Sequence, residues 1–308
     1  MKRIIKIFCL VFFAAGLLSC ASSAVKYDVS YFSNADVSPV YRISRNGNEL
    51  FIGGSVHILR ETDFPLPVEF DYAYSVSDVL VIETDVDQLQ NPEVTQYLLE
   101  NMYLPDKQTL RTVLSPQTYE MLSQALDEFG MPIMMFETMK PSMVVNVLST
   151  LQIESIGFEQ LGVDFYYFDK ARAENKPVAF LESVQVQIDT IVSVGEGYED
   201  DYVRYSLQDM GDTNGDIEAL VAQWRSGITT NVGAELDEMI NDWPLIYKAM
   251  ITDRHDAWFP QLEQFLASGK TYFVIVGYAH LPGPDGILQH FRSIGCTVEQ
   301  VAVNAVNK

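Results

Sequence analysis

The sequence predicts an α/β fold with a mostly parallel central sheet, flanked by helices, and a largely helical middle region. Three apolar runs have the length of buried strands, at residues 78–84, 177–181 and 272–276. Such runs are typical of parallel strands that are covered on both faces. Segments with helical spacing of apolar residues lie between them. Strands near both ends of the chain, with helices between, indicate one α/β domain over residues 39–308.

A hairpin is expected before the first of these runs. Residues 40–44 and 50–54 alternate as strands do, and Arg45-Asn46-Gly47-Asn48 lies between them. Asn-Gly is the strongest short hairpin signal, because both residues tolerate a positive φ.

Four helices are expected from capping residues and apolar spacing. They comprise a helix that starts at Ser115 and Pro116 and ends at Gly130, one at residues 216–224, one at residues 247–259 that Pro260 kinks or restarts, and one at residues 284–294 that stops at Gly295.

The first residues have the three parts of a lipoprotein signal peptide. A basic start with Lys2, Arg3 and Lys6 precedes an apolar run at residues 8–18, too short to span a membrane comfortably. Leu17-Leu18-Ser19-Cys20 then resembles a bacterial lipobox, with Cys20 as the lipid attachment site. We expect a signal peptide at residues 1–19 and a tether at residues 20–38. The alternatives are a plain secretory peptide cut nearby or an uncleaved anchor.

Lipid attachment predicts a location in the bacterial cell envelope, with the domain at a periplasmic or outer-membrane face. The net charge of −22 argues against binding to nucleic acid. Cys9, Cys20 and Cys296 form no disulfide framework. The chain has neither a Gly-x-Ser-x-Gly elbow nor a P-loop, which removes support for serine-hydrolase and nucleotide-binding functions.

Two of the four histidines share one local pattern. Gly54-Ser55-Val56-His57 follows one predicted strand, and Gly277-Tyr278-Ala279-His280 follows another. Each glycine permits a sharp exit from its strand, which directs the histidine off the carboxyl end. Ligand sites in parallel α/β sheets lie beyond these ends. One histidine after a strand is usually a capping or surface residue, so the repetition of the pattern carries the inference.

Two carboxylates occupy the same kind of position. Glu83 and Glu182 each stand at the end of a predicted buried strand. Two imidazoles with one or two carboxylates can bind zinc, manganese or iron. The structural alternative is a solvated glutamate or one paired with a lysine.

Arg254 falls on the apolar stripe of a predicted helix, together with Met250 and Trp258. A buried arginine needs anionic partners, and Glu83 or Glu182 could supply one. The alternative is a side chain that extends to the rim.

These residues resemble the TraB/GumN family, which includes the Tiki-type metalloproteases. The resemblance is colinear from about Tyr41 to Val301 and rests on the order and spacing of several short blocks. The blocks are Gly54 to Leu59 with Phe64 to Pro67, Val81-Ile82-Glu83, Met139-Lys140-Pro141, Gly162-Val163-Asp164 through Val178, Leu181-Glu182-Ser183 with Gln187, Trp224 to Gly227, and Val276 to Gly286.

The resemblance implies peptidase chemistry with a divalent metal, usually manganese or cobalt. The paired Gly-x-x-His motifs of the family fall on His57 and His280, and its acidic positions fall on Glu83 and Glu182. The usual Glu-Arg-Asn block is here Asp253-Arg254-His255, so His255 is expected to substitute as a polar or metal-facing group.

We therefore expect a metal-dependent hydrolase, peptidase-like, on the cell envelope, with a peptide or protein as substrate. His57 and His280 would bind manganese, cobalt or zinc, with Glu182 as a ligand or a carboxylate behind the ligands. Glu83 would be a ligand or the base for a metal-bound water, and Arg254 would stabilise an oxyanion. The alternatives are a lipoprotein that binds haem or a peptide signal without catalysis, and an esterase on the same histidine and glutamate residues.

Overall fold

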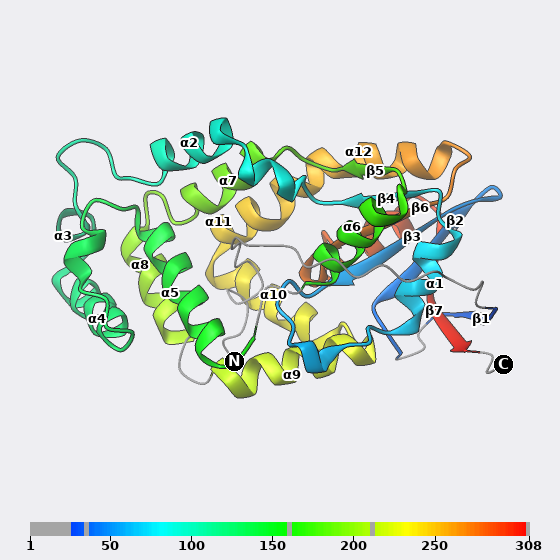
Figure 1. Cartoon of the computed structure of the whole chain (residues 1–308), viewed down its shortest axis with the longest axis horizontal. Helices are drawn as coiled ribbons and strands as arrows, with labels where there is room; N and C mark the ends of the chain where they lie inside the picture. The colour runs from blue at the N-terminus through cyan, green and yellow to red at the C-terminus, as the bar shows by residue number, and fades with distance from the viewer. Residues whose placement is uncertain (1–25, 34–36, 159–161, 210–212, 306–308) are drawn as a thin grey trace.

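The computed structural model describes residues 26–33, 37–158, 162–209 and 213–305. Its strands form one seven-stranded sheet in the order β1-β7-β2-β3-β6-β4-β5 (Figure 1). The strands are β1 (Tyr27–Phe32), β2 (Val40–Arg45), β3 (Asn48–Ser55), β4 (Val79–Ile82), β5 (Val178–Phe180), β6 (Tyr272–Gly277) and β7 (Thr297–Ala305).

The α/β class is confirmed, but the expectation of a mostly parallel sheet is wrong, because the sheet is mixed. Neighbours among β3, β6, β4 and β5 run parallel. Neighbours among β1, β7, β2 and β3 run antiparallel. The apolar runs revealed only the parallel part, since β1 alternates between half-buried and exposed residues as an edge strand does.

The predicted hairpin is confirmed. Residues 40–45 of β2 pair with residues 48–53 of β3 in register, and Asn46 and Gly47 take positive φ values of 52° and 83° between them. Residues 27–32, inside the expected tether, form β1 and pair with β7. The expected signal peptide and its Cys20 lie outside the described residues.

Two pairs of helices cover the faces of the sheet. On one face are α1 (Val68–Val76) and α6 (Val163–Glu174), and their Phe70 and Tyr167 pack with Phe273 of β6 at ring-centroid distances near 6 Å. Helices α12 (Asp253–Ala267) and α13 (Ile287–Ser293) contact each other and pack on β2, β3 and β7. Helix α6 also contacts β4, and all four residues of β4 are buried.

The remaining helices form a layer beyond the end of the sheet, from the left to the lower centre of Figure 1. They are α2 (Pro92–Asn101), α3 (Leu110–Val113), α4 (Pro116–Asp127), α5 (Pro141–Ser155), α7 (Val184–Ser193), α8 (Glu199–Asp209), α9 (Thr213–Ser226), α10 (Thr230–Asp242) and α11 (Pro244–Tyr247). No helix in the described ranges combines the length and apolar character needed to span a bilayer. The parallel strands end facing this helical layer.

The capping residues predicted the start of α4 correctly, whereas the effect expected of Pro260 on α12 was predicted less well. Helix α4 starts at Pro116, with the Ser115 hydroxyl accepting a hydrogen bond from the Thr118 N–H. Helix α12 continues through Pro260 and does not restart there. Trp258 and Leu262, on either side of this proline, are fully buried, and their packing compensates for the hydrogen bond that proline removes.

Candidate functional site

The four predicted strand-end side chains meet at one edge of the sheet. His57 follows β3, Glu83 follows β4 directly, Glu182 follows β5 and His280 follows β6. A Cβ built on Gly277 would lie 3.3 Å from His57 Nε2, 3.4 Å from Glu83 Oε1 and 3.4 Å from His280 Cδ2. The two imidazoles are therefore well within the separation of about 10 Å beyond which they could not share a site.

His57 is held by a carboxylate that the sequence analysis did not assign to the site. Its Nδ1 lies 3.1 Å from Asp164 Oδ2, and the Ser55 hydroxyl donates to Asp164 Oδ1 at 2.7 Å. Asp164 lies in the first turn of α6, after Gly162. A Cβ at Gly162 would come within 2.8 Å of His57 Cα, so only glycine lets α6 approach this closely.

The Asp164 contact orients the His57 ring. Because a carboxylate accepts hydrogen bonds, Nδ1 carries the proton and Nε2 faces the space beside Gly277. Burial disfavours the imidazolium, but Asp164 and then Glu83 outweigh it and raise the pKa of His57 to about 9. His57 is therefore mainly protonated at neutral pH.

Arg254 is buried between Glu83 and Glu182. This arrangement supplies the anionic partners that an arginine on the apolar face of a helix needs. Arg254 Nη2 donates to Glu83 Oε2 at 2.5 Å and to Glu182 Oε1 at 2.7 Å, and its Nε donates to Glu182 Oε2 at 3.1 Å. The guanidinium carbon also lies 4.5 Å from the ring centroid of Trp258. The bidentate pair with Glu182 fixes both side chains.

The two glutamates differ in their titration. Burial favours the neutral form of Glu83, but Arg254, His57 and the Gly277 N–H, which donates to Glu83 Oε1 at 2.6 Å, together lower its pKa. Burial raises the pKa of Glu182, although Arg254 opposes this. Burial also disfavours the charge of Arg254, but the two carboxylates raise its pKa. The site thus holds an arginine that stays charged between them.

A chain of hydrogen bonds runs from Arg254 through His280 and His255 to the Asp285 carbonyl oxygen, and each group donates to the next one. Arg254 Nη1 lies 3.1 Å from His280 Nε2, His280 Nδ1 lies 2.9 Å from His255 Nε2, and His255 Nδ1 lies 2.7 Å from the Asp285 carbonyl oxygen. Arginine only donates and a carbonyl only accepts. Both ends therefore require the same arrangement, in which each neutral histidine carries its proton on Nδ1.

The pKa values of His280 and His255 are both lowered, as expected for imidazoles that are neutral at neutral pH. Burial, followed by the charge of Arg254, lowers the pKa of His280 well below its usual value. Burial lowers the pKa of His255 to about 4. The sequence analysis expected His255 to be a polar or metal-facing group, and the structure shows it in contact with His280.

A π-helix, η5 (Lys248–Thr252), joins α11 to α12 and ends two residues before Arg254. π-Helical turns are rare in proteins, and those that exist are frequently found at functional sites. The segment from Pro244 to Ala267 is therefore continuous, and it presents Arg254, His255 and Trp258 to the strand ends.

Two further results concern the predicted residues. His290 stays outside the cluster: its ring stacks on Phe259 at 3.8 Å and its Nε2 contacts Glu263 at 3.0 Å. Asp164, Trp258 and Asp285 belong to the contacts of the site and were not predicted. The one sequence signal for Asp164 was its place in the Gly162-Val163-Asp164 block.

Comparison with known proteins gives a family and two relatives. The model of the TraB/PrgY/gumN family matches residues 39–300. The chain is similar to YbaP of Escherichia coli (strain K12), with 24% identity over 82% of this chain and 92% of the relative. It is also similar to YbaP of Shigella flexneri, with 24% identity over 78% of this chain and 86% of the relative. Both relatives carry the description "uncharacterized protein". No solved structure matches.

Proposed function

Because the chain belongs to the TraB/PrgY/gumN family, whose model covers almost the whole domain, we propose that it is a peptidase-like hydrolase of the bacterial cell envelope. One observation carries this proposal: His57, oriented by Asp164, directs Nε2 to the place beside Gly277 that Glu83 and His280 also border. A carbonyl substrate at this place would meet a group that moves protons and a fixed set of charges.

His57 and Asp164 would handle the proton transfers. The neutral imidazole accepts a proton from water at Nε2, and the protonated form returns it to the leaving group. Asp164 stabilises the imidazolium and holds the Nδ1–H tautomer. With a pKa of about 9, the neutral form increases as the pH rises, so turnover that needs the base should increase in the same range.

Arg254 would stabilise charge that develops on the substrate. Four of its five N–H groups are used on Glu83, Glu182 and His280. Among the described contacts, this leaves one N–H on Nη1. Because the guanidinium is already fixed, donation to an oxyanion requires no reorganisation.

Two further polar atoms could bind the substrate backbone. The Thr84 hydroxyl follows Glu83 in sequence and is buried, and Gln187 Oε1 on α7 is buried as well. Neither atom has a hydrogen-bond partner in the described part of the chain. Buried polar atoms are usually paired, so atoms of this kind are candidates for bonds to a substrate amide.

A divalent metal, which the family resemblance implies, fits the kinds of side chain but not their arrangement. No group of three or more His, Cys, Asp or Glu residues in the described ranges is placed to hold a metal ion. His280 turns Cδ2 toward Gly277, and both of its ring nitrogens are hydrogen-bonded. Binding of manganese, cobalt or zinc stays a prediction, and it requires His280 to release Arg254.

Metal content tests that prediction directly. We would measure bound metal in the purified wild type and in the His57→Ala, His280→Ala and His290→Ala proteins. A metal site predicts loss in the first two variants and retention in the third. Wild-type protein without stoichiometric metal, but with turnover that survives a chelator, would assign the hydrolysis to His57 and Arg254 alone.

Filling the place beside Gly277 tests the hydrolase proposal. Gly277→Ala adds one methyl group at 3.3–3.4 Å from His57, Glu83 and His280 and removes no chemical group. Gly233→Ala in α10 is the control, because its methyl group would approach only Pro282, at 3.9 Å.

Turnover would be followed on a fluorogenic peptide library and on p-nitrophenyl acetate. We expect a loss of at least about tenfold for Gly277→Ala, since a misplaced methyl group disturbs reacting geometry strongly, and the melting temperature of each variant checks that it is folded. Equal turnover by both variants would place the chemistry elsewhere. No turnover by wild type would favour the non-catalytic binding lipoprotein.

The anchor is tested separately. We propose that the lipid is attached at Cys20, on the basis of the lipobox-like segment that precedes it. Metabolic labelling with a palmitate analogue should mark the wild type, and Cys20→Ser should abolish the label and release the protein from membranes. A wild type without label, or a variant that stays in the membrane fraction, would contradict the anchor.

A further inference from the structure

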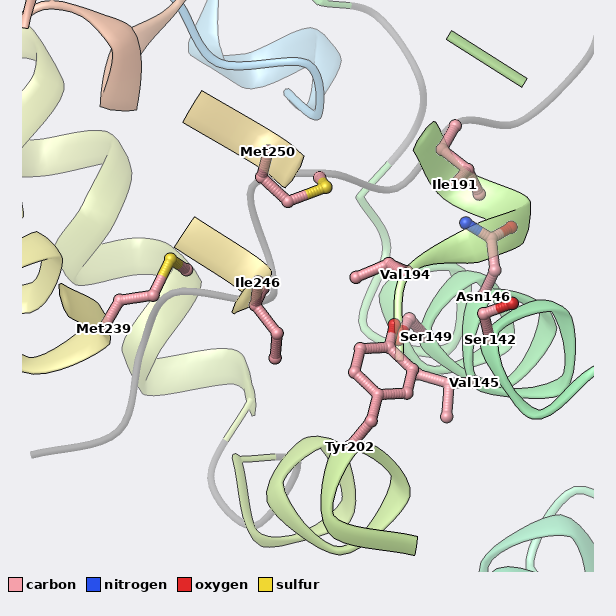
Figure 2. A pocket seen from close by; sticks show the side chains of 10 residues that line it. All are labelled: Ser142, Val145, Asn146, Ser149, Ile191, Val194, Tyr202, Met239, Ile246 and Met250. Atoms are coloured by element: carbon pink, nitrogen blue, oxygen red, sulfur yellow. The ribbon is translucent and has the colours of Figure 1, made fainter. Parts of the chain in front are cut away.

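A pocket lies among the helices next to the site, and it has no part in the chemistry described above. The empty space in and at the mouth of the pocket is about 490 Å³, and this figure includes space that is open to solvent. Figure 2 shows Ile246 and Met250 on one side, the side chains of α5 on the opposite side and Tyr202 of α8 below. Met239 of α10 completes the first side.

The pocket and the site share two structural elements. Ile246 and Met250 lie on the continuous segment that carries Arg254, four residues after Met250. Four residues make about one helical turn, so Met250 and Arg254 lie about one turn apart along the segment. Ile191 lies on α7, which begins at Val184, two residues after Glu182. The same two elements therefore hold the charged cluster and two walls of the pocket.

The lining defines the chemistry of a ligand. None of the ten lining residues is charged, and seven are aliphatic, methionine or tyrosine residues. Three polar side chains form one stripe on α5, where Ser142, Asn146 and Ser149 follow one another at helical spacing, and Tyr202 of α8 adds a hydroxyl. The Ser142 hydroxyl is used on the Val192 carbonyl oxygen. A charged ligand would lose its hydration here without a compensating ion, so the lining favours a neutral and largely apolar group.

We propose that this pocket binds an apolar, uncharged side chain of the substrate, such as leucine, next to the bond that is cleaved. The proposal rests on the proposed hydrolase function for the identity of the ligand, while the pocket itself is defined by its own residues. It names a substrate class, a peptide with an aliphatic residue close to the cleavage point.

Methionine methyl groups report on the pocket without any need for turnover. In protein labelled with carbon-13 at the methionine methyls, Met239 and Met250 would be assigned by Met239→Leu and Met250→Leu. The probe is N-acetyl-leucine amide at millimolar concentration, and N-acetyl-aspartate amide and N-acetyl-lysine amide are the charged controls. We expect saturable shifts of both methyl signals with the leucine probe and none with the charged probes.

A variant that fills the pocket tests whether the probe binds there. Ser149→Leu places a larger side chain in the pocket, and Ser155→Leu adds the same group at an exposed position of the same helix. The first variant should weaken binding of the leucine probe at least tenfold and the second should leave it unchanged, with thermal melting as the check on folding.

Each outcome has a distinct meaning. Wild-type methyl signals that stay unshifted, or that shift equally with all three probes, would overturn the proposal. Retained probe binding by a folded Ser149→Leu protein would also overturn it. If the methyl signals shift but no peptide is cleaved, the pocket stands as a binding site and the hydrolase proposal fails. If peptides are cleaved without preference for leucine over aspartate, the hydrolase stands and the pocket proposal fails.

Discussion

His57 and His280 leave the sheet through the same Gly-x-x-His pattern, yet they lie in opposite environments. His57 is 17% exposed, contacts a carboxylate and has a pKa of about 9. His280 is fully buried, contacts a guanidinium and has a pKa well below its usual value. The motif therefore determines where each imidazole lies, while its surroundings determine its charge: Asp164 of α6 for His57, and burial together with Arg254 of α12 for His280. A repeated motif need not mean a repeated role.

The largest expected effect comes from Arg254, which controls the environment of His280. Arg254→Leu leaves Glu83 and Glu182 buried without their cation and should destabilise the fold by about 3–5 kcal/mol, measured by urea unfolding. Adding Glu83→Gln and Glu182→Gln should recover part of the loss. Arg292→Leu, at an exposed position of α13, is the control. Unchanged stability of Arg254→Leu would show that the buried pairs contribute nothing.

Asp164→Asn should make His57 resemble an ordinary histidine. In protein treated with a chelator, NMR titration should show its pKa falling from about 9 toward about 6.5. Because the folded-state pKa is raised, the imidazolium stabilises the wild type below about pH 6.5, and this stability is lost as the pH rises through 9. The loss should be about 2.5 kcal/mol between pH 7 and 10, and Asp164→Asn should lack it. A variant that still titrates near pH 9 would contradict the role of Asp164.

The unfolding free energy at acidic pH tests the buried environment that His280 and His255 share. His255 has its pKa lowered to about 4, so the unfolded chain binds a proton first as the pH falls below about 6.5. Unfolding free energy should therefore drop by about 1.5 kcal/mol from this group between pH 6.5 and 5. His255→Gln should reduce the drop. The same pH dependence in the wild type and in His255→Gln would remove His255 as its source.

Ser55→Ala should have the smallest effect and sharpens the description of the His57 environment. The fully buried hydroxyl donates to Asp164 Oδ1, and its loss should cost about 1 kcal/mol in urea unfolding. The pKa of His57 should change less than in Asp164→Asn. A larger change in Ser55→Ala would mean that the hydroxyl, and not the charge of Asp164, holds the ring.

The sequence predicted the parallel half of the sheet and the strand-end side chains because both follow from local patterns. Apolar runs show buried strands, and a glycine followed by a histidine shows where a strand ends. In the antiparallel half the hairpin of β2 and β3 was predicted, but β1 and β7 were missed, because β1 is a half-exposed edge strand and β7 follows a short helix late in the sequence. Neither strand has the continuous apolar run that the prediction used.

The environment of the site could be predicted only in part. The apolar stripe that contains Arg254 predicted an arginine bound to glutamate, and the structure shows one arginine that binds two. Asp164 could not be found in this way, because its contact with His57 depends on how α6 packs against the loop after β3. The tautomer of His255 likewise depends on a carbonyl oxygen thirty residues away, at Asp285.

The π-helix at Lys248–Thr252 determines the rotational phase of α12 relative to α11. In an α-helix each residue turns the chain by about 100°, since 3.6 residues make one turn. Deleting one residue from this segment would rotate Arg254 and Trp258 away from the strand ends while Ile246 kept its place. The length of this segment is therefore as constrained as its composition. Single-residue insertions or deletions tolerated in surface loops would here separate the charged cluster from the pocket.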